Sequence, residues 1–147
     1  MITVRRTITV GKPAPAVFAY LSDFSTAVEW DPGTVSCRRI KEGSPEPAGL
    51  GAEYENVSRF KGRQTTLLYR VERFEPGQTI ALRGYNKTVT SVDTISLVAH
   101  DGSTEVGYQA DFSFNGVARF AEPLLRKSLE KLGDDAEQSL RAALSRL

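Results

Sequence analysis

The chain of 147 residues has a single cysteine and a single histidine. One thiol cannot close an internal disulfide, and one imidazole with scattered carboxylates gives no cluster with recognised metal-binding spacing. We therefore expect no metal site and no Cys–His nucleophilic pair. His100 is interpreted as an exposed loop residue and Cys37 as a small strand residue. The scarcity of cysteine favours a reducing compartment, so the expected location is the cytoplasm.

Long apolar runs and nucleotide-binding fingerprints are also missing. No stretch approaches the roughly 18 apolar residues of a membrane span, and the first ten residues alternate in polarity, unlike a signal peptide. No Gly-x-Gly-x-x-Gly, Walker or Gly-x-Ser-x-Gly motif occurs, so no cofactor is expected. The 19 basic and 18 acidic side chains nearly cancel, so no overall field favours nucleic acid or a membrane surface.

Alternation of apolar and polar residues is the main pattern present. It predicts a half-buried strand from Ile2 to Val10. Pro13 and Pro15 then open a helix, because proline is tolerated in a first turn. A second short helix from Phe24 to about Glu29 and a strand from Val35 to Ile40 complete the first third of the chain.

A hairpin turn at residues 61–62 predicts which faces of the next two strands point inward. A two-residue turn there pairs Tyr54 with Tyr69 on one face. On the other face it pairs Glu53 with Arg70, and opposite charges across a strand pair are typical of a wet surface. The tyrosine face is therefore predicted to be interior, together with Asn56, Leu67 and Val71.

Turns at Asn86-Lys87 and Asp101-Gly102 extend the same reasoning to the last three strands. Asp-Gly is a strong hairpin signal, whereas Asn-Lys is weaker. Two polar residues, Ser91 and Asp93, share the resulting inner face. The remaining members of that face are apolar or aromatic: Ile80, Leu82, Val89, Ile95, Leu97, Val106, Tyr108, Ala110, Phe112 and Phe114.

Apolar residues recur at steps of three or four from Leu125 to Leu147, which predicts a long amphipathic helix from about Val117 to the C-terminus. Gly133 is a mild interruption. The Pro/Gly-rich segment 43–51 is interpreted as a loop between strands. The expected fold is α+β: one domain over residues 1–147, with a seven-stranded antiparallel sheet wrapped around the C-terminal helix and two short helices between the first two strands.

This element order is that of the helix-grip fold, and several short motifs resemble one family with that fold. The chain is similar to the polyketide cyclase/dehydrase and lipid-transport branch of the START-like SRPBCC superfamily. The resemblance spans essentially the whole chain, although its motifs are structural rather than chemical. They are Pro15-x-Val17-Phe18-x-x-Leu21-Ser22-Asp23, Trp30-x-Pro32, Gly49-x-Gly51, Val71-x-x-Phe74-x-Pro76 and Asp101-Gly102-x-Thr104-x-Val106.

The resemblance implies a cavity between the curved sheet and the long helix, opening near the two short helices and the hairpin tips. Family members include lipid and hormone binders and aromatase/cyclases that act on polyketides. Aromatic side chains on the inner face can either line such a cavity or fill the core, and a few polar groups among them would orient a ligand. The candidate ligand-binding residues are Trp30, Tyr54, Asn56, Tyr69, Leu82, Ser91, Asp93, Tyr108 and Phe112.

Arg6 and Asp93 each fall on an otherwise apolar strand face, where an unpaired charge would be costly. In the helix-grip strand order they lie two strands apart, within reach of an arginine side chain. Alternatively, a tyrosine hydroxyl or water compensates Asp93. A further possibility is that one of the two residues lies at a strand end and reaches solvent, or that a β-bulge turns it to the other face. Pairing with Arg6 should lower the pKa of Asp93, whereas burial without a cation should raise it and suit acid–base chemistry.

Three functions follow. The favoured one is binding of a small hydrophobic molecule, such as a lipid, an isoprenoid or a polyketide-like compound. The second is a cyclase or dehydratase, for which Asp93, Tyr108 and Arg6 are the catalytic candidates. The third is a protein-interaction module resembling the co-chaperone relatives of the fold, which would need an exposed apolar patch.

Overall fold

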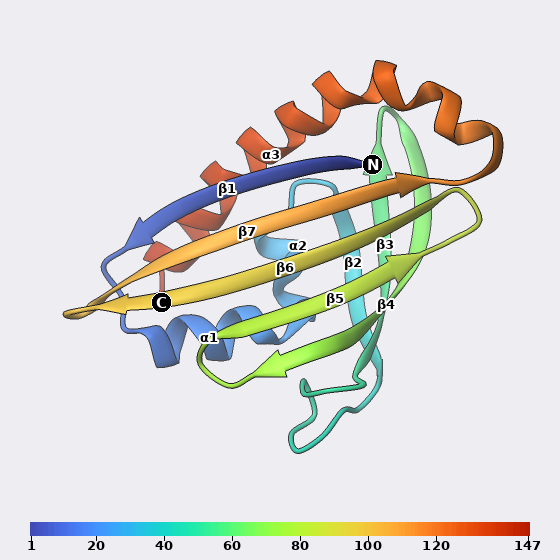
Figure 1. The fold of residues 1–147 in the computed structure, drawn as a ribbon. Helices are drawn as coiled ribbons and strands as arrows, with labels where there is room; N and C mark the ends of the chain where they lie inside the picture. The colour runs from blue at the N-terminus through green and yellow to red at the C-terminus, as the bar shows by residue number, and fades with distance from the viewer.

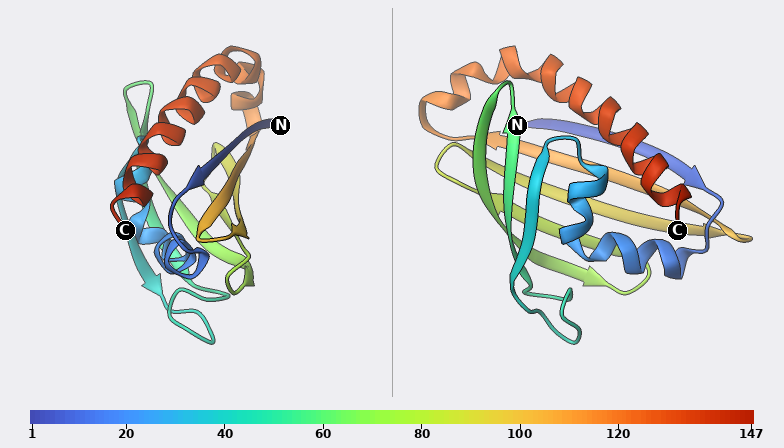
Figure 2. Two further views of the ribbon diagram at one scale, coloured as in Figure 1. Left: turned by 90° about the vertical axis from the view of Figure 1, so that its left-hand side faces the viewer. Right: turned by 180° about the vertical axis from the view of Figure 1, so that it is seen from behind.

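The computed structural model describes residues 1–147. Its seven strands form one antiparallel sheet in the order β1-β7-β6-β5-β4-β3-β2, which curves around the long helix α3 (Figures 1 and 2). The predicted fold is therefore confirmed. In chain order the elements are β1 (Ile2–Val10), α1 (Ala14–Ser22), η1 (Phe24–Thr26), α2 (Ala27–Trp30), β2 (Thr34–Lys41), β3 (Glu53–Phe60), β4 (Arg63–Glu75), β5 (Thr79–Tyr85), β6 (Val89–His100), β7 (Ser103–Phe114), η2 (Gly116–Ala121) and α3 (Glu122–Ser145).

Two helices differ from the sequence prediction at their starts. The predicted second short helix is a 3₁₀ turn, η1, that continues into the four-residue α2. The predicted C-terminal helix begins as the 3₁₀ segment η2, and α-helical geometry starts only at Glu122. Pro123 lies in the first turn of α3, where its missing N–H removes no intrahelical bond, so the proline favours this later start.

Two of the three hairpin turns have the predicted length. Lys61 and Gly62 both have positive φ, as do Asp101 and Gly102, which is the backbone of a type I′ turn. The predicted pairing of Tyr54 with Tyr69 is accordingly confirmed.

The turn at Asn86-Lys87 is longer than predicted, because Tyr85 pairs with Thr90. The Asn86 side-chain oxygen accepts hydrogen bonds from the backbone N–H groups of Thr88 and Val89, at 2.8 and 3.0 Å. This local bonding stabilises a wider loop. The extra length is an even number of residues, so the same side chains still face inward.

A β-bulge in β4 turns Phe74 toward the interior. The register with β5 shifts between Val71 and Arg73, so the side-chain alternation reverses beyond the bulge. Phe74 consequently packs against the core, with its ring centroid 5.6 Å from that of Phe18 on α1.

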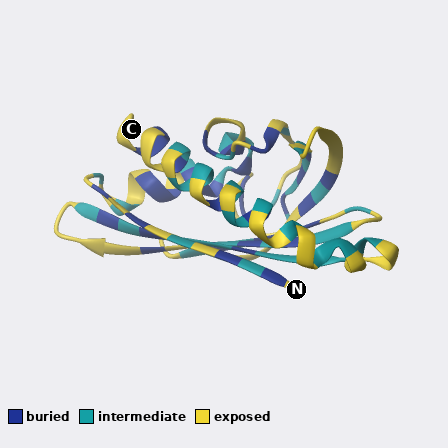
Figure 3. Ribbon diagram, turned by 90° about the horizontal axis from the view of Figure 1, so that it is seen from above, coloured by how far each residue is buried: buried dark blue, intermediate teal, exposed yellow.

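The buried apolar residues form two separate clusters. The larger includes α1, α2 and the C-terminal half of α3, and the smaller contains Ile2, Val4 and Leu129. Seen from above, buried segments of the sheet face α3, whose outer side is exposed (Figure 3). None of the helices combines the length and apolar character that a membrane crossing requires. The sheet and α3 are not in contact along the whole length of the helix, which leaves space for a site between them.

Candidate functional site

A cavity of about 500 Å³ lies between the concave face of the sheet and α3. Its walls are mostly apolar and aromatic, and its volume falls within the range of roughly 300–1,000 Å³ typical of small-molecule sites. Tyr108, Phe112 and Phe114 are only half-buried although they face inward, because the cavity opens to solvent. Its other principal wall residues are Val4, Phe60, Leu67, Tyr69, Val89, Ala110, Leu125, Leu129, Leu132 and Ala136.

The path of α3 determines where this space lies. The helix approaches β1 closely at Gly133, where an added Cβ would lie 2.5 Å from a Val4 methyl carbon. Leu140 and Leu144, further along α3, are buried in the larger core cluster. The N-terminal half of α3 therefore runs along β1 (Figure 2). The cavity lies between this half of the helix and the middle of the sheet.

The opening is bounded by hairpin tips, as expected, but not by the two short helices. The cavity is lined here by residues 58–61 and 63–65 of the β3–β4 hairpin, residues 86 and 88 of the next hairpin, and Ala118 and Ala121 of η2. No residue of α1, η1 or α2 does. Those helices instead fill the other end of the fold with the larger core cluster, so that end is closed.

A polar cluster lies on the sheet side of the cavity, centred on the buried Asp93 of β6. Its carboxylate accepts a hydrogen bond of 2.7 Å from the Ser91 hydroxyl and one of 2.8 Å from the Tyr108 hydroxyl. Burial raises the pKa of Asp93 to about 6, although both hydrogen bonds oppose that shift. Near neutral pH this carboxyl can therefore both accept and release a proton.

Asp31 is a second carboxylate lining the cavity. It is the C-cap residue of α2 and begins the turn that follows, where it accepts hydrogen bonds from the Gly33 N–H at 3.0 Å and from the Thr34 hydroxyl at 2.9 Å. Burial raises its pKa, and its charge adds to the upward shift in the pKa of Asp93. Asp31 is not among the candidate site residues expected from the sequence. Aspartate is common in turns for that backbone bonding alone, so no sequence signal marked it as part of a cavity.

Two tyrosines complete the polar side of the cavity. Burial and the neighbouring Asp93 charge raise the pKa values of both Tyr69 and Tyr108 well above the usual range. Both hydroxyls consequently stay protonated and act as hydrogen-bond donors. Tyr69 can lie against β5 because its cross-strand neighbour is Gly84, where an added Cβ would be 2.5 Å from the tyrosine ring.

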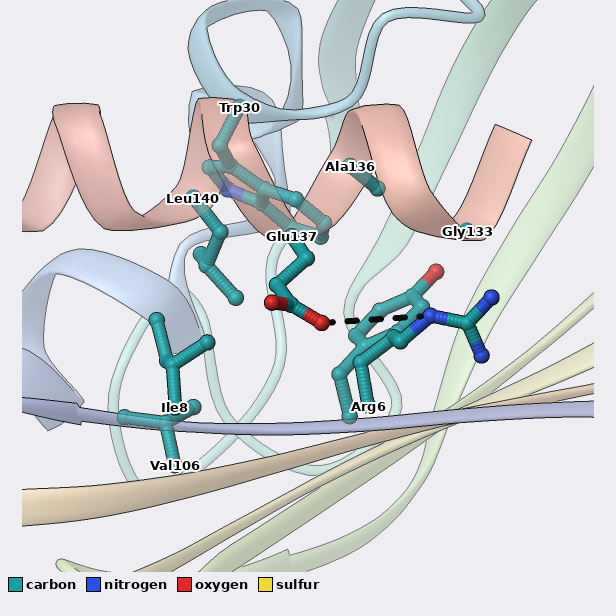
Figure 4. Close-up of a pocket in the computed structure, with 9 residues that line it drawn as sticks. Arg6, Ile8, Trp30, Val106, Gly133, Ala136, Glu137 and Leu140 are labelled. Atoms are coloured by element: carbon teal, nitrogen blue, oxygen red, sulfur yellow. Dashed lines mark ion pairs between the residues drawn. The ribbon is translucent and has the colours of Figure 1, made fainter. Parts of the chain in front are cut away.

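Arg6 does not pair with Asp93, so that proposed compensation is wrong. Its guanidinium lies 2.8 Å from Asp134 and 3.1 Å from Glu130, both on α3. Its Nε lies 3.9 Å from Glu137 on the same helix (Figure 4). Arg6 also donates to the backbone oxygen of Glu130 at 2.9 Å. The helix offers several acceptors at the point where it crosses β1, and Arg6 therefore joins β1 to α3. Asp93 is compensated by hydroxyl groups instead.

The candidate ligand-binding residues from the sequence divide into two groups. Tyr69, Ser91, Asp93, Tyr108 and Phe112 line the cavity together.

Trp30, Tyr54, Asn56 and Leu82 do not line it and are buried in the packed interior. The Asn56 amide donates to the Thr34 hydroxyl at 3.1 Å and so joins β3 to β2. The buried Tyr54 hydroxyl has no hydrogen-bond partner. Trp30 contacts a separate space of about 10 Å³ at the crossing of β1 and α3 (Figure 4).

The remaining chemistry-bearing residues lie apart from the cavity. Cys37 is half-buried in β2, where burial raises its pKa to about 11. His100 is exposed, as expected, but is the last residue of β6 rather than a loop residue. No group of three His, Cys, Asp or Glu side chains lies close enough to hold a metal ion.

Comparisons with known proteins agree with this architecture. Residues 1–145 match the family described as polyketide cyclase/dehydrase and lipid transport. No curated protein matches the chain. Among solved structures, a START superfamily protein from Mycobacterium smegmatis superposes with a TM-score of 0.81 at 14% identity, covering 98% of this chain and 97% of that one.

The Zhui aromatase/cyclase from Streptomyces sp. R1128 superposes with a TM-score of 0.80 at 19% identity, covering 98% of this chain and 93% of that one. The protein TTHA0849 from Thermus thermophilus gives a TM-score of 0.70 at 13% identity, with 96% and 98% covered. At such identities these likenesses show the fold alone. The family match over nearly the whole sequence goes further: the chain belongs to the polyketide cyclase/dehydrase and lipid-transport family.

Proposed function

We propose that this protein binds a small, mostly apolar molecule in the cavity between the sheet and α3. The observation that carries the proposal is an open cavity of about 500 Å³ whose apolar walls enclose one polar cluster, Asp93 with Ser91 and Tyr108. Membership of the family supports a hydrophobic ligand-binding or cyclase role. A lipid, an isoprenoid or a polyketide-like compound with a hydroxyl or carbonyl group fits this combination of surfaces.

The polar cluster favours a ligand with at least one polar group at the end that enters the cavity. The Tyr69 hydroxyl can donate to a ligand oxygen, and the two carboxylates can accept from a ligand hydroxyl. A purely hydrocarbon ligand would displace water from those groups and leave their remaining hydrogen-bonding capacity unused, which costs free energy.

Obstructing the opening of the cavity should weaken this binding. Ala118 lines the opening, and in Ala118→Trp the indole would occupy the space that a ligand needs. We expect an environment-sensitive apolar dye to bind the wild-type protein saturably and to bind Ala118→Trp at least about tenfold more weakly, a loss of roughly 1.4 kcal/mol. Fluorescence titration measures both affinities.

Ala142→Trp is the matched control, since Ala142 is exposed near the end of α3 and contacts no part of the cavity. It should leave the dye affinity unchanged. The absence of saturable binding to the wild-type protein, or an equal loss in both variants, would contradict the proposal.

Acid–base catalysis on the bound molecule is the second candidate, favoured by the pKa of about 6 for Asp93 inside the cavity. A cyclisation or dehydration needs a proton to be removed at one atom and supplied at another. Asp93 would exchange protons with the substrate, and the Tyr108 hydroxyl would orient the carboxylate.

If the protein turns over a polyketide-like substrate, the rate should change with pH around 6 and fall more than about tenfold in Asp93→Asn, within the range of general acid–base effects. Dye binding by the same variant checks that the cavity persists. Unchanged turnover in a variant that still binds would exclude Asp93 from the chemistry.

A further inference from the structure

The end of the molecule around the cavity opening exposes three large apolar side chains. Val117 and Phe120 of η2 and Leu124 of α3 are 86%, 73% and 77% exposed. They follow one another at steps of three and four, so they form one stripe across the 3₁₀ and α-helical turns. No residue of η2 is buried (Figure 3). Large apolar side chains so exposed and so close together mark an interaction surface.

Basic side chains flank this stripe. Lys127 continues it three residues beyond Leu124, Arg126 lies beside it, and the Arg119 guanidinium lies 5.2 Å from the centre of the Phe120 ring. None of these three cations forms an ion pair.

The β3–β4 hairpin tip adds Lys61 and Arg63, which are exposed and also without an ion pair. The Lys61 ammonium donates to the Ser128 hydroxyl at 3.2 Å, which fixes this tip beside α3. Figure 1 shows η2, the start of α3 and the hairpin tips grouped at one end of the fold. Lys61 and Arg63 also line the opening of the cavity.

Charge is therefore segregated in the folded protein, although the whole chain carries a formal net charge of only +1. The acidic residue nearest the stripe, Glu122, is already paired with the N-terminal amine at 2.6 Å. A positive surface with a projecting apolar stripe is complementary to an anionic lipid bilayer, where the apolar residues enter the headgroup boundary and the cations meet the lipid charges.

We infer that this end of the molecule docks on an anionic membrane surface through Val117, Phe120 and Leu124, with the flanking cations providing the electrostatic attraction. In that orientation the cavity opening faces the bilayer, and an apolar ligand passes between membrane and cavity without crossing water. The docking itself rests on the exposed stripe and the charge segregation. Ligand exchange rests additionally on the proposed function.

Sedimentation with lipid vesicles tests the docking. The wild-type protein should bind vesicles of phosphatidylcholine mixed with phosphatidylglycerol, and bind vesicles of phosphatidylcholine alone much more weakly. Raising the salt concentration should reduce the binding, because salt screens exposed charges. Each cation near an anionic surface contributes roughly fivefold to the affinity, so Arg126→Gln with Lys127→Gln should weaken binding about 25-fold. Phe120→Ser with Leu124→Ser should abolish sedimentation with either vesicle.

Matched controls lie far from the stripe. Arg141→Gln with Arg146→Gln removes the same charge at the other end of α3, and Ile40→Ser with Val98→Ser removes two apolar side chains exposed on strands. Both control variants should bind anionic vesicles like the wild-type protein. Phe120 and Leu124 do not line the cavity, so dye binding in solution should survive their replacement.

No binding to anionic vesicles, equal binding to neutral ones, or equal losses in stripe and control variants would overturn the inference. An acidic polypeptide such as polyglutamate that bound the stripe while vesicles did not would assign the surface to a protein partner and also overturn it. Dye binding without vesicle binding would contradict the docking but not the proposed function. Vesicle binding without dye binding would contradict the proposed function but not the docking.

Discussion

Replacing Trp30 by alanine should lower the free energy of unfolding by about 3–5 kcal/mol, the usual cost of removing a buried large aromatic side chain. Trp30 is 1% exposed, and its indole N–H donates to the Thr26 hydroxyl at 3.1 Å. Its ring makes edge contacts with Phe24 and Tyr108, with centroids 6.2 and 5.6 Å apart. Removing the indole would leave a void at the crossing of α2, β1 and α3.

Urea denaturation followed by circular dichroism measures this effect, because Trp30 is the only tryptophan and its fluorescence is lost in the variant. Val28→Ala is the control on the same short helix, since Val28 is 48% exposed, and it should cost less than about 0.5 kcal/mol. If Trp30→Ala proves too unstable to purify, Trp30→Phe should give a smaller but measurable loss. Similar costs for Trp30→Ala and Val28→Ala would contradict the packing role.

Trp30 also matters indirectly to the cavity. Its edge contact supports the Tyr108 ring, whose hydroxyl holds the Asp93 carboxylate. Trp30 is therefore a positioning residue for the polar cluster, although it does not line the cavity.

Asp93 should make the protein less stable as pH rises through the acidic range. Its pKa is about 6 in the folded protein and near 3.8 when unperturbed, so between these values the folded state binds more protons than the unfolded state. By linkage, the contribution of Asp93 to stability is complete below pH 3.8 and is lost as pH rises through 6, a change of about 3 kcal/mol.

The measurement is the difference in unfolding free energy between the wild-type protein and Asp93→Asn, determined at several pH values. Asparagine stays neutral throughout, so the variant should become relatively more stable by about 3 kcal/mol between pH 3 and pH 8. Asp135→Asn removes an exposed carboxylate of α3 and controls for the loss of charge alone. If the difference in unfolding free energy does not vary with pH, or varies with the opposite sign, the pKa of Asp93 is not raised by folding and the prediction is wrong.

The contrast between Asp93 and Arg6 shows what the alternation of side chains along a strand can predict and what it cannot. Alternation correctly assigned Asp93 to the inner face, because the Asp101-Gly102 turn defines the register of β6 with β7. It could not determine what compensates the carboxylate. That depends on Tyr108 across the strand pair and on three acidic groups of α3 that attract Arg6 away from the sheet.

The same limit applies to the cavity wall. The alternation along a strand separates inward from outward residues, and it assigns Tyr54, Leu82 and Phe112 to the inner face. The alternation cannot tell whether an inward residue is covered by another element or faces open space. Tyr54 and Leu82 lie in the packed core near the short helices, whereas Phe112 lies beneath the part of α3 that stands off from the middle of the sheet.

The sequence by itself determined the order of the elements, the antiparallel sheet and the inward face of most strands, because these follow from local periodicity and from turns of defined length. Only the tertiary structure decided where the space lies and which charges meet. Both depend on the close approach of α3 to β1 at Gly133, where an added Cβ would be 2.5 Å from Val4, and no local pattern encodes the distance between segments so far apart in the chain.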